Sequence, residues 1–591
     1  MNLFVLAWNL AEDLSATILG ELQRMTDTYP ELDPDSLWTF GDGRRIFAAS
    51  IHTPLSALGT RRYVWIDENS ATFYDGTAVD SLGDRPVYDA KFLASAWNEL
   101  PGFLDGQYSL ARVGDSPPAV TLMSDFLGMR DTFYCRAEQG YVVSNSAMLL
   151  SKILGTRAFD PLGVSTCLTW GWPSGDRSLL RDVSVVPPAQ IWEWRSPDPA
   201  PHRRDYSPRG RLAQLTRSSP TQATVSAATT TLTRMVGNLN RHLGDLSCAL
   251  TGGRDTRLIA SMLHHAGVPV PYVTFAPRDS AEARIASRVA GVLAVQHVIE
   301  SSPAGSVADQ WDDLAPKLVS QNDGMVSLWQ IQTLLNRSTC VDHLPLRLHC
   351  HAGELLRATY TEPRHLVGNP SSKGITRSLI HKLVDDHGGL LREDTLQQSR
   401  SYLHQFVKDQ IEMGFQANEV PDVFQAFERT GRWAGTIIRP SLPVTENFQP
   451  FCTRHAAELA FSMNLPDRYF EKFNRGAIRL LAPQLVGVPF GKLSHRYARL
   501  VKDVAGLLAR VTGVGGLRTT GYQGSPQAAW IEAVRPRLRE ICLDQSDSDL
   551  WTYVDRACFE QITSHSADPL ERARRAEGLL QVSTLFYYAL V

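Results

Sequence analysis

The feature that most constrains the fold is an alternation of short apolar runs with helical periods in the middle of the chain. Residues 246–250 read as a short buried strand, and an amphipathic helical pattern follows over 257–266. The pattern then repeats, with a strand over 270–275 and a helix over 281–293. Strands that alternate with helices predict a parallel, doubly wound sheet. We therefore expect an α/β domain here.

The chain before this region has a different period. Short alternating apolar runs with turn residues between them indicate antiparallel strands, at 64–66, 108–111, 120–123, 132–135 and 141–144. A break rich in proline and arginine follows at 194–211. We expect an α+β domain over 1–196, a linker over 197–215, and an α/β domain with a parallel sheet and many helices over 216–591.

Composition excludes several classes of protein. The 591 residues carry 59 Lys and Arg against 62 Asp and Glu, a net charge of −3 that argues against a nucleic-acid partner. The eight cysteines show no CxxC pair and no metal-ligand spacing, which favours a reduced compartment. No apolar run reaches the length of a membrane span, and the N-terminus lacks the pattern of a signal peptide. These patterns predict a cytoplasmic protein with no membrane partner.

The connection between the first strand and helix of the α/β region is a candidate phosphate loop. It consists of Thr251, Gly252, Gly253, Arg254, Asp255 and Thr256. Paired glycines let several backbone N–H groups converge, and the helix start adds its positive dipole end. The hydroxyls of Thr251 and Thr256 can donate to phosphate, and Arg254 or Arg257 can neutralise charge. Asp255 can hold Mg²⁺. Taken alone, Gly-Gly after a strand is also compatible with a simple turn.

Three segments in order carry a resemblance to a known family. The loop at 251–256 resembles the SGGxDS loop of ATP-pyrophosphatases, with Thr for both Ser residues. The next strand ends in Thr274 and Phe275, and 279–286 resembles the DExxxA helix that follows the nucleotide strand. Residues 347–360, RLHCHAGELLRATY, resemble the GEGxDELFGGY loop. Together they resemble the asparagine synthetase family, including β-lactam synthetase and lasso-peptide cyclases.

This resemblance implies an adenylation chemistry with ATP and Mg²⁺. In one register Glu354 takes the place of the family's metal-binding Asp and His351 that of a catalytic Glu; shifted by one, Gly353 sits at the metal position. We prefer the first register, because it gives Asp255 a second carboxylate for the metal. His351 is then a candidate general base. The alternative is that His349 and His351 only satisfy hydrogen bonds beside a strand end.

Two more segments extend the resemblance towards the C-terminus. Residues 449–466 resemble the PFLDxxxxEFAxxLP stretch, and 473–483 resemble the KxxLRxxxxxxLP helix. In the family, a lysine after this helix stabilises the acyl-adenylate or the transition state. The nearest match is Lys492, for which a solvated loop lysine is the alternative.

The first domain is similar to the glutaminase domain of the same family. Residues 100–154 resemble its LDGxFAFxxxD, RDxxGxxPLYY and FxSExKALL motifs, which implies an Ntn-like fold with αββα layers. Glutamine-dependent members use a cysteine that is exposed as the new N-terminus. Here that position holds Asn2, which has no nucleophilic atom. We therefore expect an inactive glutaminase-like domain.

The sequence as a whole predicts an ATP-dependent amide-bond synthetase of specialised metabolism. It would adenylate a small-molecule or peptide carboxylate, release pyrophosphate, and join the acyl group to a substrate amine without hydrolysing glutamine. One alternative is an asparagine-type synthetase that uses free ammonia. Another is a non-catalytic scaffold that keeps the fold. The sequence leaves the oligomeric state open, a homo-oligomer included.

Overall fold

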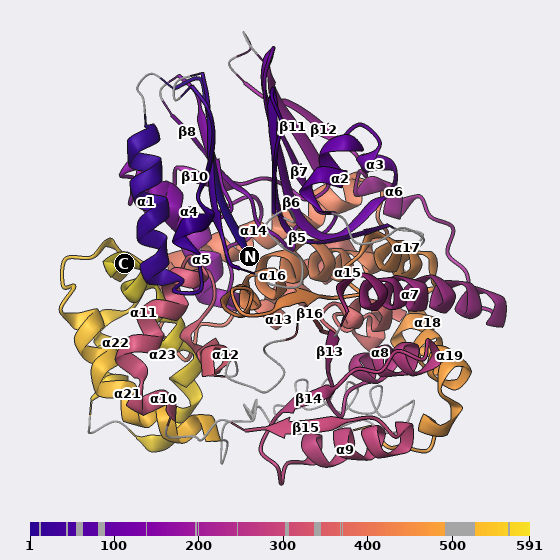
Figure 1. Cartoon of the computed structure of the whole chain (residues 1–591). Coiled ribbons are helices and arrows are strands. Elements are labelled where there is room, and N and C mark those ends of the chain that lie inside the picture. Colours follow the sequence, from indigo (N-terminus) through magenta and orange to yellow (C-terminus); the bar gives the residue numbers. More distant parts are fainter. Residues whose placement is uncertain are drawn as a thin grey trace.

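We describe the protein from a computed structural model (Figure 1). The structure describes residues 1–10, 14–42, 45–54, 63–80, 89–137, 139–195, 198, 200–244, 246–301, 306–335, 344, 346–366, 368, 370–490, 526–564 and 568–591.

The first two hundred residues form two antiparallel sheets of six strands each. The first sheet has the order β10 (Val183–Val185), β8 (Phe133–Arg136), β9 (Tyr141–Ser144), β1 (Asn2–Trp8), β3 (Ile46–His52) and β2 (Trp38–Gly41). The second has the order β12 (His202–Asp205), β11 (Gln190–Arg195), β7 (Pro118–Ser124), β6 (Leu104–Asp115), β5 (Ser70–Asp80) and β4 (Val64–Ile66). The predicted antiparallel character of this part is confirmed.

These two sheets pack face to face, with helices on their outer sides (Figure 1). Phe4 and Leu6 of β1 share one apolar cluster with Phe73 of β5 and Trp192 of β11, so the space between the sheets is a hydrophobic core. The outer face of the first sheet packs on α1 (Ser15–Thr28) and α4 (Ala147–Leu154). That of the second packs on α2 (Ala90–Ser95) and α3 (Leu100–Phe103). The layers therefore run helix, sheet, sheet, helix.

The segment predicted as a linker contains regular structure. Residues of β12 pair antiparallel with β11, from Gln190 opposite Asp205 to Glu193 opposite His202. A short helix, α6 (Gly210–Ala213), follows. An edge strand can carry exposed arginines on both faces, so the arginine-rich composition that suggested a linker is compatible with β12. The second sheet consequently extends to residue 205.

The second part of the chain holds a five-stranded parallel sheet, as predicted. Its order is β15 (His297–Glu300), β14 (Tyr272–Phe275), β13 (Leu246–Ala249), β16 (Leu346–Leu348) and β17 (Glu446–Phe448). The chain leaves the central strand β13 in one direction for β14 and β15, and later continues on the other side with β16 and β17. A topological switch point therefore lies between β13 and β16.

Helices surround this sheet and fill the rest of the second part. They are α7 (Gln222–Leu243), α8 (Arg254–His265), α9 (Ala281–Leu293), α12 (Gln332–Leu335), α13 (Ser372–Leu383), α14 (Glu393–Glu412), α15 (Val420–Phe424), α16 (Gly435–Ile437), α17 (Arg454–Ser462), α18 (Leu465–Tyr469) and α19 (Lys472–Leu481). A π-helix, Gln425–Ala434, lies between α15 and α16. The helix predicted over 257–266 begins three residues earlier, directly after the glycine pair.

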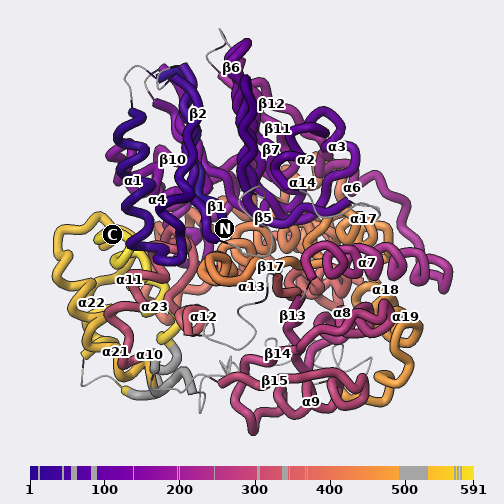
Figure 2. The backbone as a smooth tube through the Cα atoms, viewed as in Figure 1, coloured from indigo at the N-terminus to yellow at the C-terminus, as the bar shows by residue number. Residues whose placement is uncertain are grey.

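A separate helical layer brings the end of the chain back to its beginning (Figure 2). It consists of α10 (Ser306–Asp309), α11 (Trp311–Gln321), α21 (Pro526–Leu543), α22 (Arg556–Thr563) and α23 (Pro569–Leu590), which share a core with α1, α4 and α5 (Pro161–Trp170). Trp311 Nε1 donates to the Tyr587 hydroxyl over 2.8 Å. The apolar end of the chain is therefore a packed helix. Among the residues described, no helix has the length and apolarity that crossing a bilayer demands.

Buried polar contacts join the first part of the chain to the second. The side-chain amide of Gln107 on β6 donates to the carbonyl oxygens of Gln449 and Cys452 and accepts from the Gln449 N–H. The Asp105 carboxylate accepts from the backbone N–H of Arg454 at the start of α17. Because these groups are buried and their hydrogen bonds cross the boundary, separating the two parts would leave buried polar groups without those partners and would cost stability.

Candidate active site

The predicted site residues gather at the switch point of the parallel sheet. Strands β13 and β16 are direct neighbours, with Leu246 opposite Leu346 and Cys248 opposite Leu348. The loop at 251–256 and the segment that begins at His349 therefore leave the sheet from the same edge. In open α/β sheets, ligands bind at the carboxyl ends of the strands at such a point. The structure thus brings together the two segments that the sequence singled out separately.

The loop after β13 is held closed by its two threonines. The Thr251 hydroxyl lies 3.0 Å from the Thr256 hydroxyl and accepts from the Gly253 N–H over 3.0 Å. Thr256 also accepts from the Thr251 N–H over 3.2 Å. Gly253 caps α8, so the first N–H groups of this helix point out of the loop. This is the arrangement expected for binding phosphate, since helix N-termini attract anions.

The segment after β16 approaches the start of α8 more closely than most side chains would allow. A Cβ atom on Gly353 would lie 2.4 Å from Cγ of Asp255, so only glycine fits at this position. Gly353 begins a short 3₁₀ helix, Gly353–Arg357, whose flanking residues Ala352 and Ala358 have φ values of 62° and 46°. Left-handed backbone is costly for alanine and tends to cluster at functional sites.

Both predicted metal ligands face arginines. The Asp255 carboxylate accepts from Arg357 through both oxygens, from Nε over 3.0 Å and from Nη2 over 2.5 Å. Glu354 Oε1 lies 3.9 Å from Nη1 of Arg429, a π-helix residue. Within the described parts of the chain, no three His, Cys, Asp or Glu side chains are grouped as metal donors. As arranged here, Asp255 and Glu354 do not fit a Mg²⁺ ion, and the magnesium requirement stays a prediction.

Burial and charge set the protonation of this pair. Burial alone lowers the pKa of Arg357, but the adjacent Asp255 carboxylate more than reverses this and raises it above its ordinary value. Arg357 therefore carries a full charge at every accessible pH. A two-point contact of this kind is among the stronger pairings in proteins.

The arginine of the phosphate loop also has a carboxylate partner. Arg254 contacts Glu471 through Nε, and Glu471 is 5 % exposed. Glu471 adopts a left-handed backbone, with a φ of 60°, at the start of α19. Arg475, one turn later on that helix, lies 3.6 Å from the same carboxylate. The Arg254 guanidinium is therefore oriented by a carboxylate at the start of a neighbouring helix.

The two histidines after β16 stack on each other beside the π-helix. The rings of His349 and His351 lie 5.9 Å apart at 16°, and the His351 ring meets Trp433 edge-on at 6.4 Å. The Arg429 guanidinium lies over the Trp433 ring, 4.4 Å from the ring centre. Burial, with a contribution from Arg429, lowers the pKa of His351 to about 4. The imidazole is therefore neutral at pH 7, and its unprotonated ring nitrogen can accept a proton.

The remaining predicted residues have mainly structural contacts in this structure. The Thr274 hydroxyl donates to the Leu250 carbonyl over 2.6 Å and lies 2.8 Å from His297 Nε2, so it ties neighbouring strands together. The ring of Phe275 lies 5.3 Å from the Arg347 guanidinium. Arg257, an alternative for neutralising phosphate, instead donates to the Val488 carbonyl over 2.6 Å. Lys492 lies outside the described residues.

Sequence reasoning missed four residues of this site: Arg357, Arg429, Trp433 and Glu471. Arg357 stands inside the segment quoted for its resemblance, three residues after Glu354, and its charge was a readable signal. Arg429 and Trp433 belong to a π-helix, and i to i+5 bonding leaves no clear mark in a sequence.

The position that would hold a glutaminase nucleophile is buried and polar. Asn2 is fully buried, and its side-chain amide donates to the Tyr74 carbonyl over 3.3 Å. The amine of Met1 donates to the Tyr63 hydroxyl over 2.8 Å. These contacts therefore fix β1 against its neighbouring segments.

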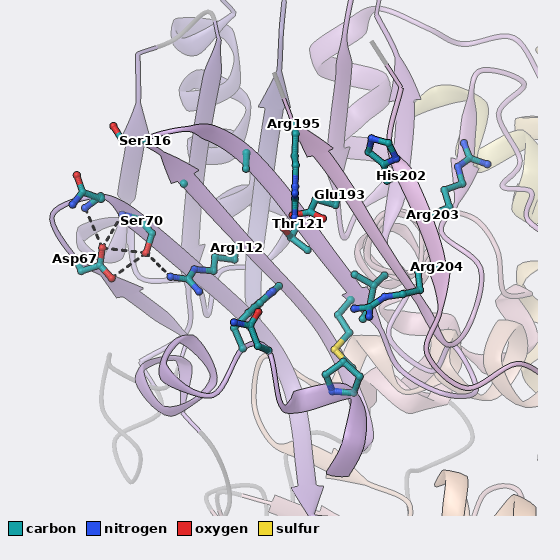
Figure 3. A pocket seen from close by; sticks show the side chains of 18 residues that line it. Asp67, Ser70, Arg112, Ser116, Thr121, Glu193, Arg195, His202, Arg203 and Arg204 are labelled. Carbon is teal, nitrogen blue, oxygen red and sulfur yellow. Dashed lines mark hydrogen bonds and ion pairs between the residues drawn. The ribbon is translucent and has the colours of Figure 1, made fainter. Parts of the chain in front are cut away.

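An open groove of about 810 Å³ lies on the outer face of the second antiparallel sheet (Figure 3). Its lining residues all belong to the first 204 residues of the chain. Arg112 Nη2 lies 3.4 Å from the Ser70 hydroxyl, which Asp67 in turn holds. The groove has several arginines but shares no lining residue with the phosphate loop.

Comparisons with known proteins do not identify the chain. No protein-family model matches it, and no match is found among curated proteins. One aligned structure, the allosteric regulatory enzyme of purine biosynthesis, is 9 % identical over 51 % of this chain and 81 % of its own, with a TM-score of 0.24. Glutamine phosphoribosylpyrophosphate amidotransferase from B. subtilis, complexed with ADP and GMP, is 10 % identical over 51 % and 65 %, with a TM-score of 0.23. Because both TM-scores lie far below 0.5, these alignments support no conclusion about fold or function.

Proposed function

We propose that this protein is an ATP-dependent amide-bond synthetase. The observation that carries the proposal is the glycine loop at 251–256, which opens α8 at the switch point of the parallel sheet. A loop of this kind suits the phosphates of a nucleotide. The chemistry follows from the resemblance of this loop and of residues 347–360 to the asparagine synthetase family.

The reaction has two steps that balance in bonds and charge. A carboxylate oxygen of the first substrate attacks the α-phosphorus of ATP, and the bond to the β-phosphate oxygen breaks to release pyrophosphate. An amine nitrogen of the second substrate then attacks the acyl carbon, and AMP leaves as the amide forms. The nitrogen loses its proton to a base.

The described residues have roles suited to each step. The N–H groups at the start of α8 and the Arg254 guanidinium stabilise the charge that develops on pyrophosphate. His351, neutral at pH 7, accepts the proton that the amine releases. With a pKa of about 4 it is a weak base, so it accepts the proton as the C–N bond forms rather than before. Thr251 and Thr256 keep the loop in its closed shape.

The amine comes from a substrate rather than from glutamine in this proposal. Asn2 has neither a thiol nor a hydroxyl, and its amide is held by the Tyr74 carbonyl. Hydrolysis by an N-terminal nucleophile needs such a group. A small-molecule or peptide amine is therefore the expected nucleophile, and free ammonia is the alternative.

Nucleotide binding tests the first requirement. Calorimetric titration of the full chain with ATP should give saturable binding, and Thr256→Val should weaken it because the loop loses its internal hydrogen bond. Thr230→Val is the matched control, because its exposed hydroxyl on α7 bonds only to the Ser226 carbonyl among the described residues. A chain that binds no ATP at millimolar concentration, or in which both variants behave alike, contradicts the proposal and favours a non-catalytic scaffold.

Exchange of labelled pyrophosphate into ATP tests the adenylation step. We expect exchange to depend on an added carboxylate, and a panel of amino acids and short peptides is a practical probe. Exchange with aspartate, followed by asparagine formation only when ammonium is added, would instead identify the asparagine-type alternative.

A further inference from the structure

The Asp255 carboxylate, in the first turn of α8, already has a partner for both of its oxygens. Arg357 contacts both oxygens of Asp255, at 3.0 Å and 2.5 Å. The two side chains are only 17 % and 11 % exposed, so little water reaches the pair. A metal ion would have to replace a guanidinium that matches the carboxylate in shape and charge.

The backbone keeps Arg357 close to this position. Gly353, at the other end of the same 3₁₀ turn, lies against Asp255 so closely that no side chain fits between them. Ala352 and Ala358 flank the turn with left-handed backbone, which persists only where the surroundings enforce it. Arg357 therefore extends from a segment that is fixed against the start of α8 on both sides.

The charge of the second predicted metal ligand, Glu354, is also balanced by an arginine. Glu354 faces Arg429 at 3.9 Å, and Arg429 is itself placed over the ring of Trp433. Together with Arg254, which pairs with Glu471, three arginines lie beside the phosphate loop, and each of them faces a carboxylate. A guanidinium has five N–H donors, so one that holds a carboxylate through two of them can also donate to the phosphate oxygens of a nucleotide.

We propose that Arg357 takes the place of a divalent cation at Asp255, so that this site binds ATP without a metal ion at that carboxylate. The inference rests on the proposed nucleotide function and departs from the Mg²⁺ site that the sequence predicts. In this site Asp255 orients Arg357, and Arg357 meets the phosphates.

Binding of ATP to the full chain in excess Mg²⁺ and in EDTA tests the inference. For the unmodified protein we expect dissociation constants that agree within about threefold, which corresponds to about 0.6 kcal/mol. Arg357→Gln should weaken binding in EDTA by about 30-fold or more, as expected for loss of a charge-assisted contact, and part of the loss should return in Mg²⁺ because Asp255 becomes available. Arg357→Lys keeps the charge but cannot make the two-point contact, so its affinity for ATP should lie between those of the unmodified protein and Arg357→Gln.

Arg217→Gln is the matched control. Arg217 also contacts a carboxylate through two nitrogens, on Glu419 at 2.6 Å and 3.1 Å, and its side chain is 15 % exposed. This pair includes no residue of the site, so the variant should bind ATP as the unmodified protein does in both conditions. A loss equal to that of Arg357→Gln would assign the effect to general loosening of the fold and overturn the inference.

A direct measurement on the unmodified protein guards against a variant that does not fold. Titration with Mn²⁺ alone, followed by electron paramagnetic resonance, should show no saturable site that Asp255→Asn removes. A Mn²⁺ site that this variant abolishes, or ATP binding that is lost in EDTA, overturns the inference while the proposed function stands. Absence of ATP binding in both conditions overturns the proposed function itself.

Discussion

The guanidinium of Arg257 lies 4.0 Å from the ring centre of Phe490. Arg254 reaches the same ring, at 4.4 Å, so Phe490 contacts two arginines at the start of α8. Arg257 also donates to the carbonyl oxygens of Val488 and Pro489. The segment that leads to Lys492 is therefore attached to the phosphate loop through its last described residue.

We predict that Phe490→Ala weakens ATP binding more than it weakens the fold. The variant removes the ring that holds Arg254 and Arg257, at about 0.5 to 1 kcal/mol for each partly exposed cation–π contact. Calorimetric titration with ATP measures the first effect and urea unfolding the second. Phe490→Trp should preserve both, because it presents a larger aromatic face to the same arginines. Unchanged ATP binding in Phe490→Ala would show that this segment does not support the site.

Gly353→Ala should disrupt the site although it adds only one methyl group. That methyl would lie 2.4 Å from Cγ of Asp255, so either the 3₁₀ turn or the start of α8 must move. Overpacking of this kind typically costs about 1 to 3 kcal/mol. Gly476→Ala on α19 is the control, because its nearest neighbours lie at 3.5 Å and a helix favours alanine. A thermal scan should show a lower midpoint for the first variant only.

Only part of the site around Gly353 could be predicted from the sequence. The order of strands and helices over 246–293 predicted a parallel sheet, but strand β16 and the switch point that brings the two motifs together were found only in the structure. The register between Gly353 and Glu354 could not be chosen in this way. Close approach of Gly353 to Asp255 depends on how two distant segments pack, and the pairing of Asp255 with Arg357 joins residues that are 102 positions apart.

Two further details of the structure could not be predicted from the sequence, for local physical reasons. The segment around β12 has the composition of a linker, yet its backbone finds partners on β11, and exposed edge strands tolerate such side chains. Thr274 has the right position for a nucleotide contact, but its hydroxyl is closer to the Leu250 carbonyl and His297. The sequence alone does not distinguish a hydroxyl that donates to a buried carbonyl from one that is available to bind a ligand.

Asp323→Asn tests the contact between the first and second parts of the chain. Asp323 is 1 % exposed; it accepts from the Ser146 hydroxyl and the Met148 N–H at the start of α4, and it pairs with Arg439 at 2.5 Å. Asparagine has the same shape and tolerates the observed φ of 53°. The variant therefore removes the carboxylate that pairs with the buried Arg439 and leaves Asp131 as the other acidic group acting on it, at a cost of about 3 kcal/mol.

Urea unfolding of Asp323→Asn measures this cost. Asp309→Asn is a suitable comparison, because this residue is exposed on the short helix α10 and makes no ion pair among the described residues. A loss below about 1 kcal/mol, the range of a surface pair, would contradict a structural role for Asp323 in joining the two parts.

His365 should make the protein less stable in weak acid. The residue is fully buried, and its Nδ1 accepts from the Glu362 N–H over 3.1 Å, which places the ring proton of the neutral form on Nε2. Burial lowers the pKa of His365 to about 4. An unfolded chain has a histidine pKa near 6.5 and binds the proton first as the pH falls. The stabilisation is thus complete above pH 6.5 and is lost between pH 6.5 and 4.

By pH 5 this linkage should lower the free energy of unfolding by about 2 kcal/mol relative to pH 7. Other buried histidines contribute to the same trend, so the test is a difference between two proteins. In His365→Gln the amide oxygen can accept from Glu362 but the side chain does not titrate. Urea unfolding at pH 7 and pH 5 should therefore show a fall that is about 2 kcal/mol smaller for the variant. Equal falls in both proteins would mean that His365 takes up a proton in the folded state as easily as in the unfolded chain, contrary to its burial.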